Sequence, residues 1–506
     1  MREILVENIV RSHPGVHQVV ALRDDGGGIA VFVVPEDSYF DNQSGRQAAD
    51  HLTLNRWRKV YDLSQLTKEA AGAQVGFNTA GWDSSYTRRP IPDPDIREWV
   101  EATVASILEL NPRRIYEIGC GTGLLLTKIA PGLERYLGAD FSSGVLARLQ
   151  AQLLALPALG EQVELSHRQA DDFSGLGADS FDTVVLNSVA QYFPSLAYMT
   201  NVLEHAVELV KPGGHIYIGD VRSLPLLPAF ATSVELFQAA DSMPAADLTA
   251  RIRNRLEKDK ELVISPAYFL YQQSRLAKIS RVEIRLQRGR SDNEMTRYRF
   301  SAVLHIAHEQ KSVSHVEFHD WEPVRWSIDN MRKAVEQGLN QIVGIRGIKN
   351  ARVEQDLAVM EMLNEDSTSN TAGTIRRQLA TRQTEGNFPE DIFDLEVIRP
   401  DIEVKLSWAA AGTDGSFDAV FIPRHLQDAS NAIAVDWPRP AAQTFMRLSN
   451  TSSLEKIRRD FINRVESYTK ENLPANMSLA RIDLVDSLAR DSRGEIDEAA
   501  LLAFRA

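Results

Sequence analysis

The stretch Tyr116–Leu126, YEIGCGTGLLL, places three glycines between a short apolar run and a helical pattern. The glycines are Gly119, Gly121 and Gly123. Because glycine has no Cβ, a loop of this kind lets the backbone approach a ligand closely. The order of apolar run, glycine loop and helical pattern therefore predicts a strand, a tight turn and a helix that together form a nucleotide site.

Strand-like and helical segments alternate on both sides of this loop. The apolar segments RRIYEIG, ERYLGADF, VELSHRQ, FDTVVLNS and GGHIYIGDV are separated by helical patterns. Near residues 282–307, VEIRLQRG and YRFSAVLHI have the pattern of a closing hairpin, and EVKLSW and FDAVFI predict another strand pair. Short buried strands alternating with helices are typical of an α/β fold with a parallel, doubly wound sheet.

Composition and charge exclude several classes of protein. The chain has 506 residues, which suggests about two to four domains. Its net charge of −13 argues against nonspecific nucleic-acid binding. No apolar run reaches the roughly 20 residues of a membrane span, and we find no signal sequence. The one cysteine, Cys120, fits a cytoplasmic setting, and its place in the glycine loop favours a packing role over a catalytic thiol.

An acidic residue before the glycines indicates which nucleotide is bound. A dinucleotide loop reads G-x-G-x-x-G, whereas this loop reads Glu117-x-Gly119-x-Gly121-x-Gly123. Glu117 would repel a pyrophosphate but tolerates a ligand that carries an ammonium group and no phosphate. S-adenosylmethionine (SAM) is such a ligand, and the pattern resembles motif I of class I SAM-dependent methyltransferases.

Later segments extend this resemblance in the expected order. Asp140 ends the second strand, where its carboxylate would accept hydrogen bonds from both ribose hydroxyls, with a strand-end cap as the alternative. Asp171 or Asp172, with Asp171 preferred, would bind the adenine amino group, and Phe173 would lie against the ring. The residues assigned to cofactor binding are Glu117, Gly119, Gly121, Gly123, Asp140, Phe141, Asp171, Asp172, Phe173, Asn187, Ser188 and Tyr86.

Longer motifs resemble the methyltransferase domains embedded in nonribosomal peptide synthetases. They include GWDSSYTRRPIP, NSVAQYFPS and the stretch that begins KPGGHIYIGDVRSLP, and the resemblance covers roughly residues 50–425. Both ends of the chain look like parts of the small C-terminal subdomain of an adenylation domain. The implied fold is a class I, Rossmann-like domain with a mostly parallel seven-stranded sheet and a closing hairpin, plus an α+β adenylation-type subdomain split between the two ends.

The resemblance divides the chain into five segments. They are residues 1–37, the first part of the adenylation subdomain; 50–110, a helical lid segment; 111–310, the methyltransferase core; 311–425, an accessory region; and 440–506, the rest of the adenylation subdomain. The ATP-binding part of an adenylation domain is missing. Glu495, in RGEID, stands where the family has a lysine that contacts the acyl-adenylate. We therefore expect no amino-acid activation, and the chain is either a synthetase fragment or a protein that acts in trans.

The resemblance implies N-methylation of an aminoacyl group tethered to the phosphopantetheine arm of a carrier protein. An adenylation core or a small MbtH-like protein is a further expected partner. Methylation of oxygen, sulfur or carbon, and a non-catalytic docking module, remain as alternatives. The basic stretch Arg288–Arg290 supports the fold, meets an acidic carrier protein, or is a solvated turn.

Catalytic candidates follow the fourth and fifth strands, because open α/β sheets bind ligands at the carboxyl ends of their strands. They are Asn187, Gln191, Tyr192, Asp220 and Arg222. Asn187 and Tyr192 would accept hydrogen bonds from the amine, and Asp220 would act as a base or orient one. The alternatives are a packing role for Tyr192 and a salt bridge between Asp220 and Arg222. His167 and His215 are expected to pack or face solvent, and no metal-binding spacing is found.

Overall fold

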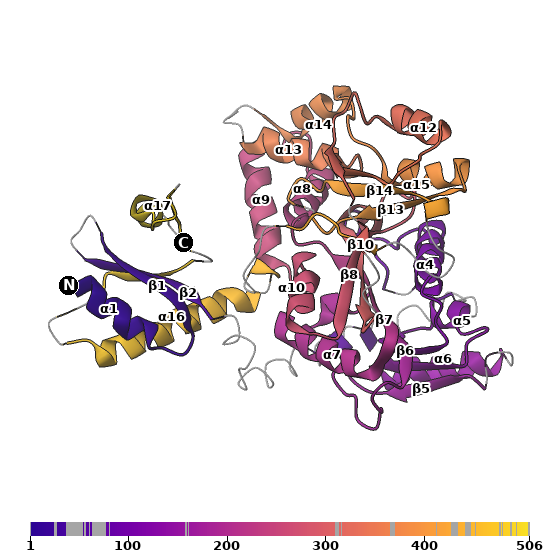
Figure 1. Cartoon of the computed structure of the whole chain (residues 1–506), viewed down its shortest axis with the longest axis horizontal. Coiled ribbons are helices and arrows are strands. Elements are labelled where there is room, and N and C mark those ends of the chain that lie inside the picture. Colours follow the sequence, from indigo (N-terminus) through magenta and orange to yellow (C-terminus); the bar gives the residue numbers. More distant parts are fainter. Residues whose placement is uncertain are drawn as a thin grey trace. The chain divides into compact units, whose positions relative to one another are not determined.

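The computed structural model contains two compact units, residues 52–441 (the central unit) and residues 1–51 with 442–506 (the end unit) (Figure 1). The structure describes residues 2–24, 28–36, 54, 57–59, 61–62, 77–79, 81–156, 159, 161–308, 313–314, 316–364, 370–410, 412–426, 434–440, 447–450, 452–474, 477, 479–485, 488–491 and 493–503. Much of the predicted lid segment, including residues 63–76, lies outside the described residues.

A seven-stranded sheet forms the middle of the central unit. Its strands are β3 (Arg114–Ile118), β4 (Arg135–Asp140), β5 (Val163–His167), β6 (Phe181–Asn187), β7 (Val210–Arg222), β8 (Ile279–Leu286) and β9 (Arg299–Ile306). The strand order is β5-β4-β3-β6-β7-β9-β8. Strands β3 to β7 are parallel, and β9 runs antiparallel to both β7 and β8. The predicted class I fold and its closing hairpin are confirmed.

Helices cover both faces of this sheet (Figure 1). One face carries α4 (Asp93–Leu108), α5 (Leu126–Ile129) and α6 (Ser143–Leu154), and the other carries α7 (Leu196–Leu209) and α10 (Ala267–Arg275). The side chains of Ser142 and Ser195 accept hydrogen bonds from the first turns of α6 and α7, which fixes where these two helices begin. Apolar side chains from α4, α5, α6 and β3 share one core cluster, so the sheet is buried between two helical layers.

The remaining elements of the central unit form two groups. Helices α8 (Leu227–Gln238), α9 (Ala245–Lys258), α13 (Glu354–Asn364) and α14 (Ala372–Thr381) share a second apolar cluster. A four-stranded sheet has the order β11 (Phe318–Asp320), β12 (Val343–Ile348), β14 (Phe417–Pro423), β13 (Ile402–Ser407), which confirms the second predicted strand pair. Shorter elements and flanking helices are η3 (Ala190–Tyr192), α11 (Glu294–Tyr298), β10 (Val313–Ser314), α12 (Ile328–Glu336), α15 (Pro389–Ile398), η4 (Arg424–Leu426) and β15 (Ala434–Val435).

The end unit joins the two ends of the chain in one sheet. Its elements are α1 (Arg2–Arg11), β1 (Val16–Arg23), β2 (Ile29–Pro35), α16 (Ser452–Asn472), β16 (Arg481–Leu484) and α17 (Glu498–Ala503). Strand β2 pairs antiparallel with β1 and parallel with β16. None of the described helices combines the length and apolar character that a membrane crossing requires.

Candidate active site

A cavity of about 940 Å³ lies at the carboxyl ends of the parallel strands of the central unit. Strand β3 lies between β4 and β6, so the chain order reverses here, as it does at the ligand sites of open α/β sheets. Predicted residues that line the cavity are Glu117, Gly119, Gly121, Asp140, Phe141, Asn187, Ser188, Gln191, Tyr192 and Arg222. Predicted residues absent from its lining are Gly123, Asp171, Asp172, Phe173, Tyr86 and Asp220.

The glycine loop connects β3 to α5 along the floor of this cavity. Gly119 has a φ of +77°, and a Cβ at this position would lie 2.4 Å from Val189 Cγ2. Gly123 has a φ of +81°, and its Cβ would lie 2.6 Å from Leu149 Cδ1. Both positions therefore favour glycine for two reasons. The left-handed backbone conformation is strained for residues with a side chain, and a Cβ would collide with the neighbouring side chain. Gly123 supports the loop from behind and does not face the cavity.

Replacing Gly119 by alanine is expected to destabilise the central unit by about 2–3 kcal/mol, since backbone strain of about 1–2 kcal/mol is joined by a clash. Gly132 is the matched control, because it has a φ of +88° and nothing lies within 4 Å of the position that a Cβ would take there. The loss of stability in Gly132→Ala should therefore come from backbone strain alone. Chemical denaturation of both variants measures the difference, and the double variant Gly119→Ala/Val189→Ala should recover the part that the clash contributes. Equal losses for the two single variants would contradict this account.

Two buried carboxyl groups face the loop. Glu117 is 3% exposed and accepts a hydrogen bond of 2.8 Å from the Tyr136 hydroxyl. Burial raises the pKa of Glu117 to about 7, so its charge is gained near neutral pH. Asp140 accepts hydrogen bonds from the backbone N–H groups of Gly121 (3.0 Å) and Ser142 (2.9 Å). Burial also raises the pKa of Asp140, against the effect of these two donors.

The single thiol of the loop is fully packed. Cys120 is buried and lies 3.1 Å from the position that a Cβ on Gly138 would take. Burial raises the pKa of the Cys120 thiol well above its usual range, so little thiolate is present for nucleophilic chemistry. This agrees with the packing role expected for Cys120.

The predicted adenine residues take other partners in the structure. Asp171 accepts a hydrogen bond of 2.8 Å from the hydroxyl of Tyr198, which itself lines the cavity. Asp172 accepts hydrogen bonds from the backbone N–H and the hydroxyl of Ser174, and these bonds lower the pKa of Asp172. Phe173 stacks on His205 at 5.2 Å. The side chain of Asp171 is therefore linked to the cavity through Tyr198.

Tyr86 lies beside the cavity on the same segment as residues that line it. Its hydroxyl donates a hydrogen bond of 3.2 Å to Ser233 Oγ, and its ring packs edge-on against Phe237 with ring centres 5.5 Å apart. Trp82 and Ser85 do line the cavity. Ser85 is fixed by Glu294, which accepts from its backbone N–H at 2.9 Å and its hydroxyl at 2.8 Å.

Two amide side chains offer unused acceptors in the cavity wall. Asn187 and Gln191 are 8% and 6% exposed, respectively. Asn187 Oδ1 and Gln191 Oε1 have no hydrogen-bond partner within the described part of the chain. Gly219, on the neighbouring strand β7, makes room for Asn187, because a Cβ there would lie 2.1 Å from Asn187 Oδ1. A buried acceptor without a partner costs free energy, so these two oxygens mark a place where a ligand donor fits.

Asp220 and Arg222 do not form the salt bridge that was considered for them. The side chain of Asp220 is fully buried and accepts a bond of 2.6 Å from Arg299 Nη1, as well as a bond from the Ser188 hydroxyl. Arg222 pairs instead with Asp259 at 2.7 Å and Glu261 at 2.9 Å. Side chains at alternate positions of a strand normally share a face, but Asp220 has a φ of +60°, and the β7–β9 pairing is irregular between Ile218 and Val221.

Several residues of the cavity wall were not predicted from the sequence. Arg299 and Glu294 come from the hairpin region, and Trp57 and Tyr61 come from the predicted lid segment. Tyr61 stacks on Phe141 with ring centres 6.0 Å apart, and Trp57 packs against Tyr192 at 5.0 Å. Asp220 and Arg299 are 79 positions apart, and no local pattern indicates that they pair.

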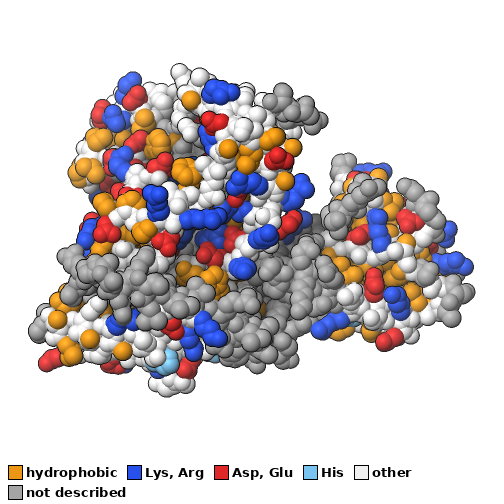
Figure 2. Space-filling model, turned by 180° about the vertical axis from the view of Figure 1, so that it is seen from behind, with side chains coloured by type: hydrophobic (Ala, Val, Ile, Leu, Met, Phe, Trp, Pro, Cys, Tyr) orange, Lys and Arg blue, Asp and Glu red, His pale blue; other side chains and the backbone are white. Residues whose placement is uncertain are grey.

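Charged side chains surround the outer end of the cavity. Arg255, Lys258 and Lys260 line it, together with Asp259 and Glu261. Figure 2 shows Lys and Arg side chains around a hollow on one face of the larger unit, with acidic side chains among them. Arg288 and Arg290 belong elsewhere: Arg288 lies over the Phe393 ring, and Arg290 pairs with Asp391 and Asp394 on α15. These two arginines thus contact other parts of the central unit and do not line the cavity.

Comparisons with known proteins indicate a methyltransferase domain in this part of the chain. A methyltransferase-domain family matches residues 116–216. The chain is 33% identical over 518 residues to chondramide synthase cmdD of Chondromyces crocatus, covering 98% of this chain and 13% of that protein. It is 27% identical over 531 residues to cyclosporin synthetase simA of Tolypocladium inflatum, covering 98% of this chain and 3% of that protein. The chain thus spans a small part of these relatives.

Solved structures of methyltransferases are also similar. One is the N-methyltransferase NodS from Bradyrhizobium japonicum in complex with S-adenosyl-L-homocysteine, at 16% identity and a TM-score of 0.28, covering 44% of this chain and 99% of that one. The family match includes the end of β3, the glycine loop and Asp140, which contribute to the lining of the cavity. The chain therefore contains a methyltransferase domain with a class I fold, and almost its whole length is similar to a part of much larger synthases and synthetases.

Proposed function

We propose that this chain methylates the α-amine of an aminoacyl group carried on the phosphopantetheine arm of a carrier protein. The observation that supports an amine substrate best is the pair of buried acceptors, Asn187 Oδ1 and Gln191 Oε1, in the wall of the cavity. An amine donates hydrogen bonds, and these oxygens can only accept them. The synthetase relatives make a carrier-tethered substrate the natural source of that amine.

The cavity residues fit SAM. Its methionine ammonium group would be held near Glu117, and its ribose hydroxyls would be held by Asp140, with Phe141 beside the base. The glycines leave the backbone open to the ligand, and Asp171 would reach the adenine through the Tyr198 hydroxyl. When bound, SAM supplies a methyl group that its sulfonium already activates.

The work left to the protein is therefore placement of the amine and exclusion of water. A neutral amine nitrogen gains the methyl group and releases a proton, and the α-amine of a thioester needs little help to be neutral near pH 7. Asn187 and Gln191 would hold the amine by its N–H groups, and Tyr192 and Trp57 would cover it. Asp220, which is bound by Ser188 and Arg299, would act as a positioning residue for Ser188.

The outer end of the cavity suits the phosphopantetheine arm. Arg255, Lys258 and Lys260 offer positive charge at the rim, where the phosphate of the arm would lie. Arg255 is already paired with Glu235 at 2.7 Å, so the two lysines are the main candidates. An acidic carrier protein would meet the same charges.

The end unit would serve as an adenylation-type subdomain that presents this methyltransferase to its synthetase partners. In this proposal, residues 1–37 and 440–506 form the subdomain, residues 50–110 form a lid, 111–310 form the catalytic core and 311–425 form an accessory region. An adenylation core or an MbtH-like protein would dock on the subdomain.

Intact-mass analysis tests the proposed function. A panel of aminoacyl carrier proteins is incubated with the chain and SAM, with free amino acids in parallel. We expect an increment of one or more methyl groups on the carrier-linked species. Two matched substrates locate the atom: an N-acetylaminoacyl carrier and a 2-hydroxyacyl carrier should both remain unmodified. A Gln191→Leu variant has a side chain of similar volume but no hydrogen-bond acceptor. It should slow methyl transfer by about tenfold or more.

Other outcomes would replace the proposal. Methylation of the 2-hydroxyacyl carrier would indicate an O-methyltransferase, and methylation of free amino acids would indicate a small-molecule enzyme. The proposed activity would be contradicted if the chain binds SAM but methylates no amine, even when a synthetase partner is added. The remaining explanation would then be a non-catalytic docking module.

A further inference from the structure

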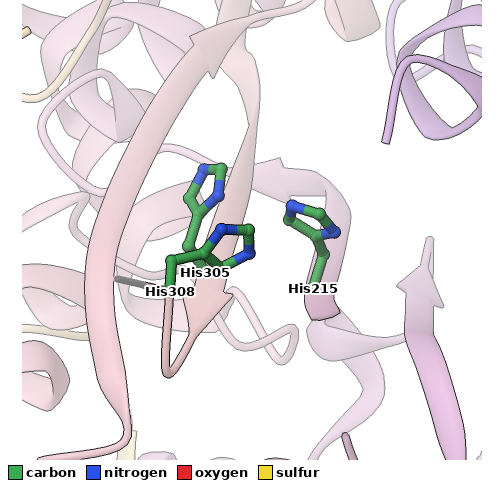
Figure 3. Close-up of side chains that lie close together, drawn as sticks. All are labelled: His215, His305 and His308. Carbon is green, nitrogen blue, oxygen red and sulfur yellow. The ribbon is translucent and has the colours of Figure 1, made fainter. Parts of the chain in front are cut away.

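Three histidines that are far apart in the sequence meet at the opposite end of β7 from Arg222. His215 lies on β7, His305 lies directly across from it on β9, and His308 is in the turn that follows β9. The ring centres are 4.9 Å apart for His215 and His305, 4.8 Å for His215 and His308, and 5.1 Å for His305 and His308. Figure 3 shows the three rings gathered around a common space. The cluster is separate from the methyltransferase cavity, whose lining contains none of the three.

The spacing of these rings suits a metal ion. One nitrogen from each ring lies within 4.8 Å of the others. A tetrahedral Zn²⁺ with bonds of about 2.0–2.1 Å to three imidazoles separates the ring centres by roughly 5 Å. Since the ring centres already have this separation, rotation of the rings brings the nitrogens together with little movement of the backbone. The paired strands β7 and β9 hold two of the three ligands in place.

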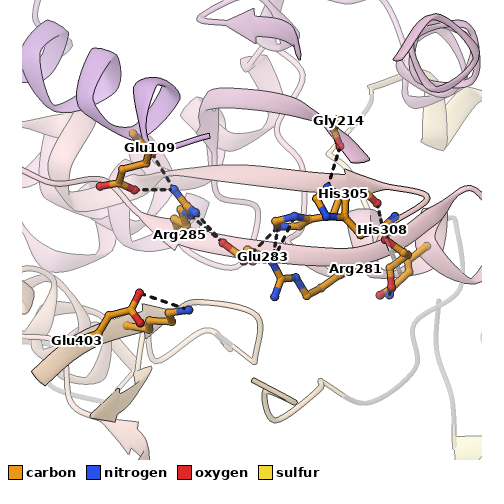
Figure 4. Close-up of polar contacts among 12 residues, drawn as sticks. Glu109, Gly214, Arg281, Glu283, Arg285, His305, His308 and Glu403 are labelled. Atoms are coloured by element: carbon orange, nitrogen blue, oxygen red, sulfur yellow. Dashed lines mark hydrogen bonds and ion pairs between the residues drawn. The ribbon is translucent and has the colours of Figure 1, made fainter. Parts of the chain in front are cut away.

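The hydrogen bonds around the cluster orient two of the rings. His305 Nε2 lies 3.1 Å from Glu283 Oε1, and His308 Nε2 lies 3.3 Å from the carbonyl oxygen of Gly214 (Figure 4). Both partners accept hydrogen bonds, so these contacts favour the tautomers with hydrogen on Nε2. Metal-ligating histidines usually donate their other N–H to a carboxylate or a backbone carbonyl in this way. The lone pair of Nδ1 is then the ligand atom in each of these two rings.

The cluster is not sealed from solvent. His215 and His308 are only partly buried, so water can reach the cluster and complete the coordination.

Arg281 is the feature that opposes a cation. Its Nη2 lies 3.0 Å from His305 Nε2 and 3.2 Å from His305 Nδ1, and it pairs with Glu283 at 3.0 Å. Glu283 also binds Arg285, which reaches Glu109 (Figure 4). The side chain of Arg281 is 32% exposed, so it can turn toward solvent. When Arg281 turns away, Glu283 keeps its ion pair with Arg285 and remains beside the cluster as a negatively charged group.

We propose that His215, His305 and His308 bind a divalent transition-metal ion of the Zn²⁺ class, with water as the fourth ligand. Imidazole ligands favour zinc, cobalt, nickel and copper over magnesium and calcium. The ion would join β7, β9 and the turn after β9, far from the methyltransferase cavity. Its role is therefore structural: it stabilises the antiparallel part of the sheet and takes no part in methyl transfer.

The test uses the full, untagged chain after dialysis against a chelator. Titration with Zn²⁺ is expected to show one binding site per chain and a rise in melting temperature, whereas Mg²⁺ should change neither. Co²⁺ should give the visible absorption bands of tetrahedral coordination, and Zn²⁺ should displace it. His308→Asn, a change in a partly buried turn residue, should weaken binding at least 100-fold, and His215→Asn should do the same. Arg281→Gln should tighten binding about tenfold.

His425→Gln is the matched control, because His425 is exposed on η4 and distant in sequence from the cluster. It should leave the titration unchanged. SAM binding serves as the check that each variant is folded. The proposal is overturned if the wild-type chain shows no saturable site for Zn²⁺, or if the site survives in folded His215→Asn and His308→Asn variants.

Discussion

Asp140→Asn is expected to weaken SAM binding by about 100- to 1,000-fold. The carboxylate accepts from the backbone N–H groups of Gly121 and Ser142, so it shapes the loop as well as facing the cavity. An amide keeps one acceptor oxygen, and its NH₂ group faces the other N–H donor. Hydrogen bonds to a charged group are worth about 1.5–3 kcal/mol each, and about 1.4 kcal/mol corresponds to a tenfold change in affinity.

Isothermal titration calorimetry with SAM measures this effect. Glu164→Gln is the matched control, because Glu164 lies on the neighbouring strand β5 and makes an exposed pair with Arg135 at 2.8 Å. Exposed pairs contribute about 0–1 kcal/mol, so this variant should bind SAM as the wild type does. If Asp140→Asn loses less than tenfold in SAM affinity and its melting temperature is unchanged, Asp140 acts only as a strand-end cap.

Arg299→Met is expected to lower the free energy of unfolding by about 3–5 kcal/mol, because it leaves the charge of Asp220 buried without its partner. The Asp220 side chain is fully buried and that of Arg299 is 17% exposed. The double variant Asp220→Leu/Arg299→Met removes both charges and should recover most of the loss. Lys349→Met is the control, because the Lys349–Glu385 pair is largely exposed and should contribute about 0–1 kcal/mol.

Chemical denaturation of the wild type, the single variants Asp220→Leu and Arg299→Met, and the double variant gives the coupling energy between Asp220 and Arg299. Similar losses for Arg299→Met and Lys349→Met would contradict a strong buried pair. The same series tests the role of Asp220 in the reaction. Asp220→Asn keeps an oxygen for Arg299 and Ser188, so a positioning role predicts that methyl transfer falls less than tenfold. A far larger loss in a stable Asp220→Asn protein would make Asp220 the base that was considered for it.

Local sequence patterns predicted the alternation of strands and helices, and the resemblance of the glycine loop to SAM-dependent methyltransferases predicted the cofactor. A strand, a glycine loop and a helix follow one another within a few residues, so their geometry depends on backbone conformation that the local sequence specifies. The same holds for Asp140, which ends the next strand, and for the hairpin of β8 and β9. These elements form the floor of the cavity. Their order along the chain indicates a SAM site without any knowledge of tertiary contacts.

Side-chain partners were decided by the tertiary structure. Asp220 pairs with Arg299 and not with the nearby Arg222, because an irregularity in β7 and the close approach of β9 determine what each side chain meets. The pairing of β2 with β16, and the meeting of His215, His305 and His308, likewise join parts of the chain that are far apart. Local patterns specify strands, turns and helices, but a pair of distant side chains is specified only when packing brings their elements together.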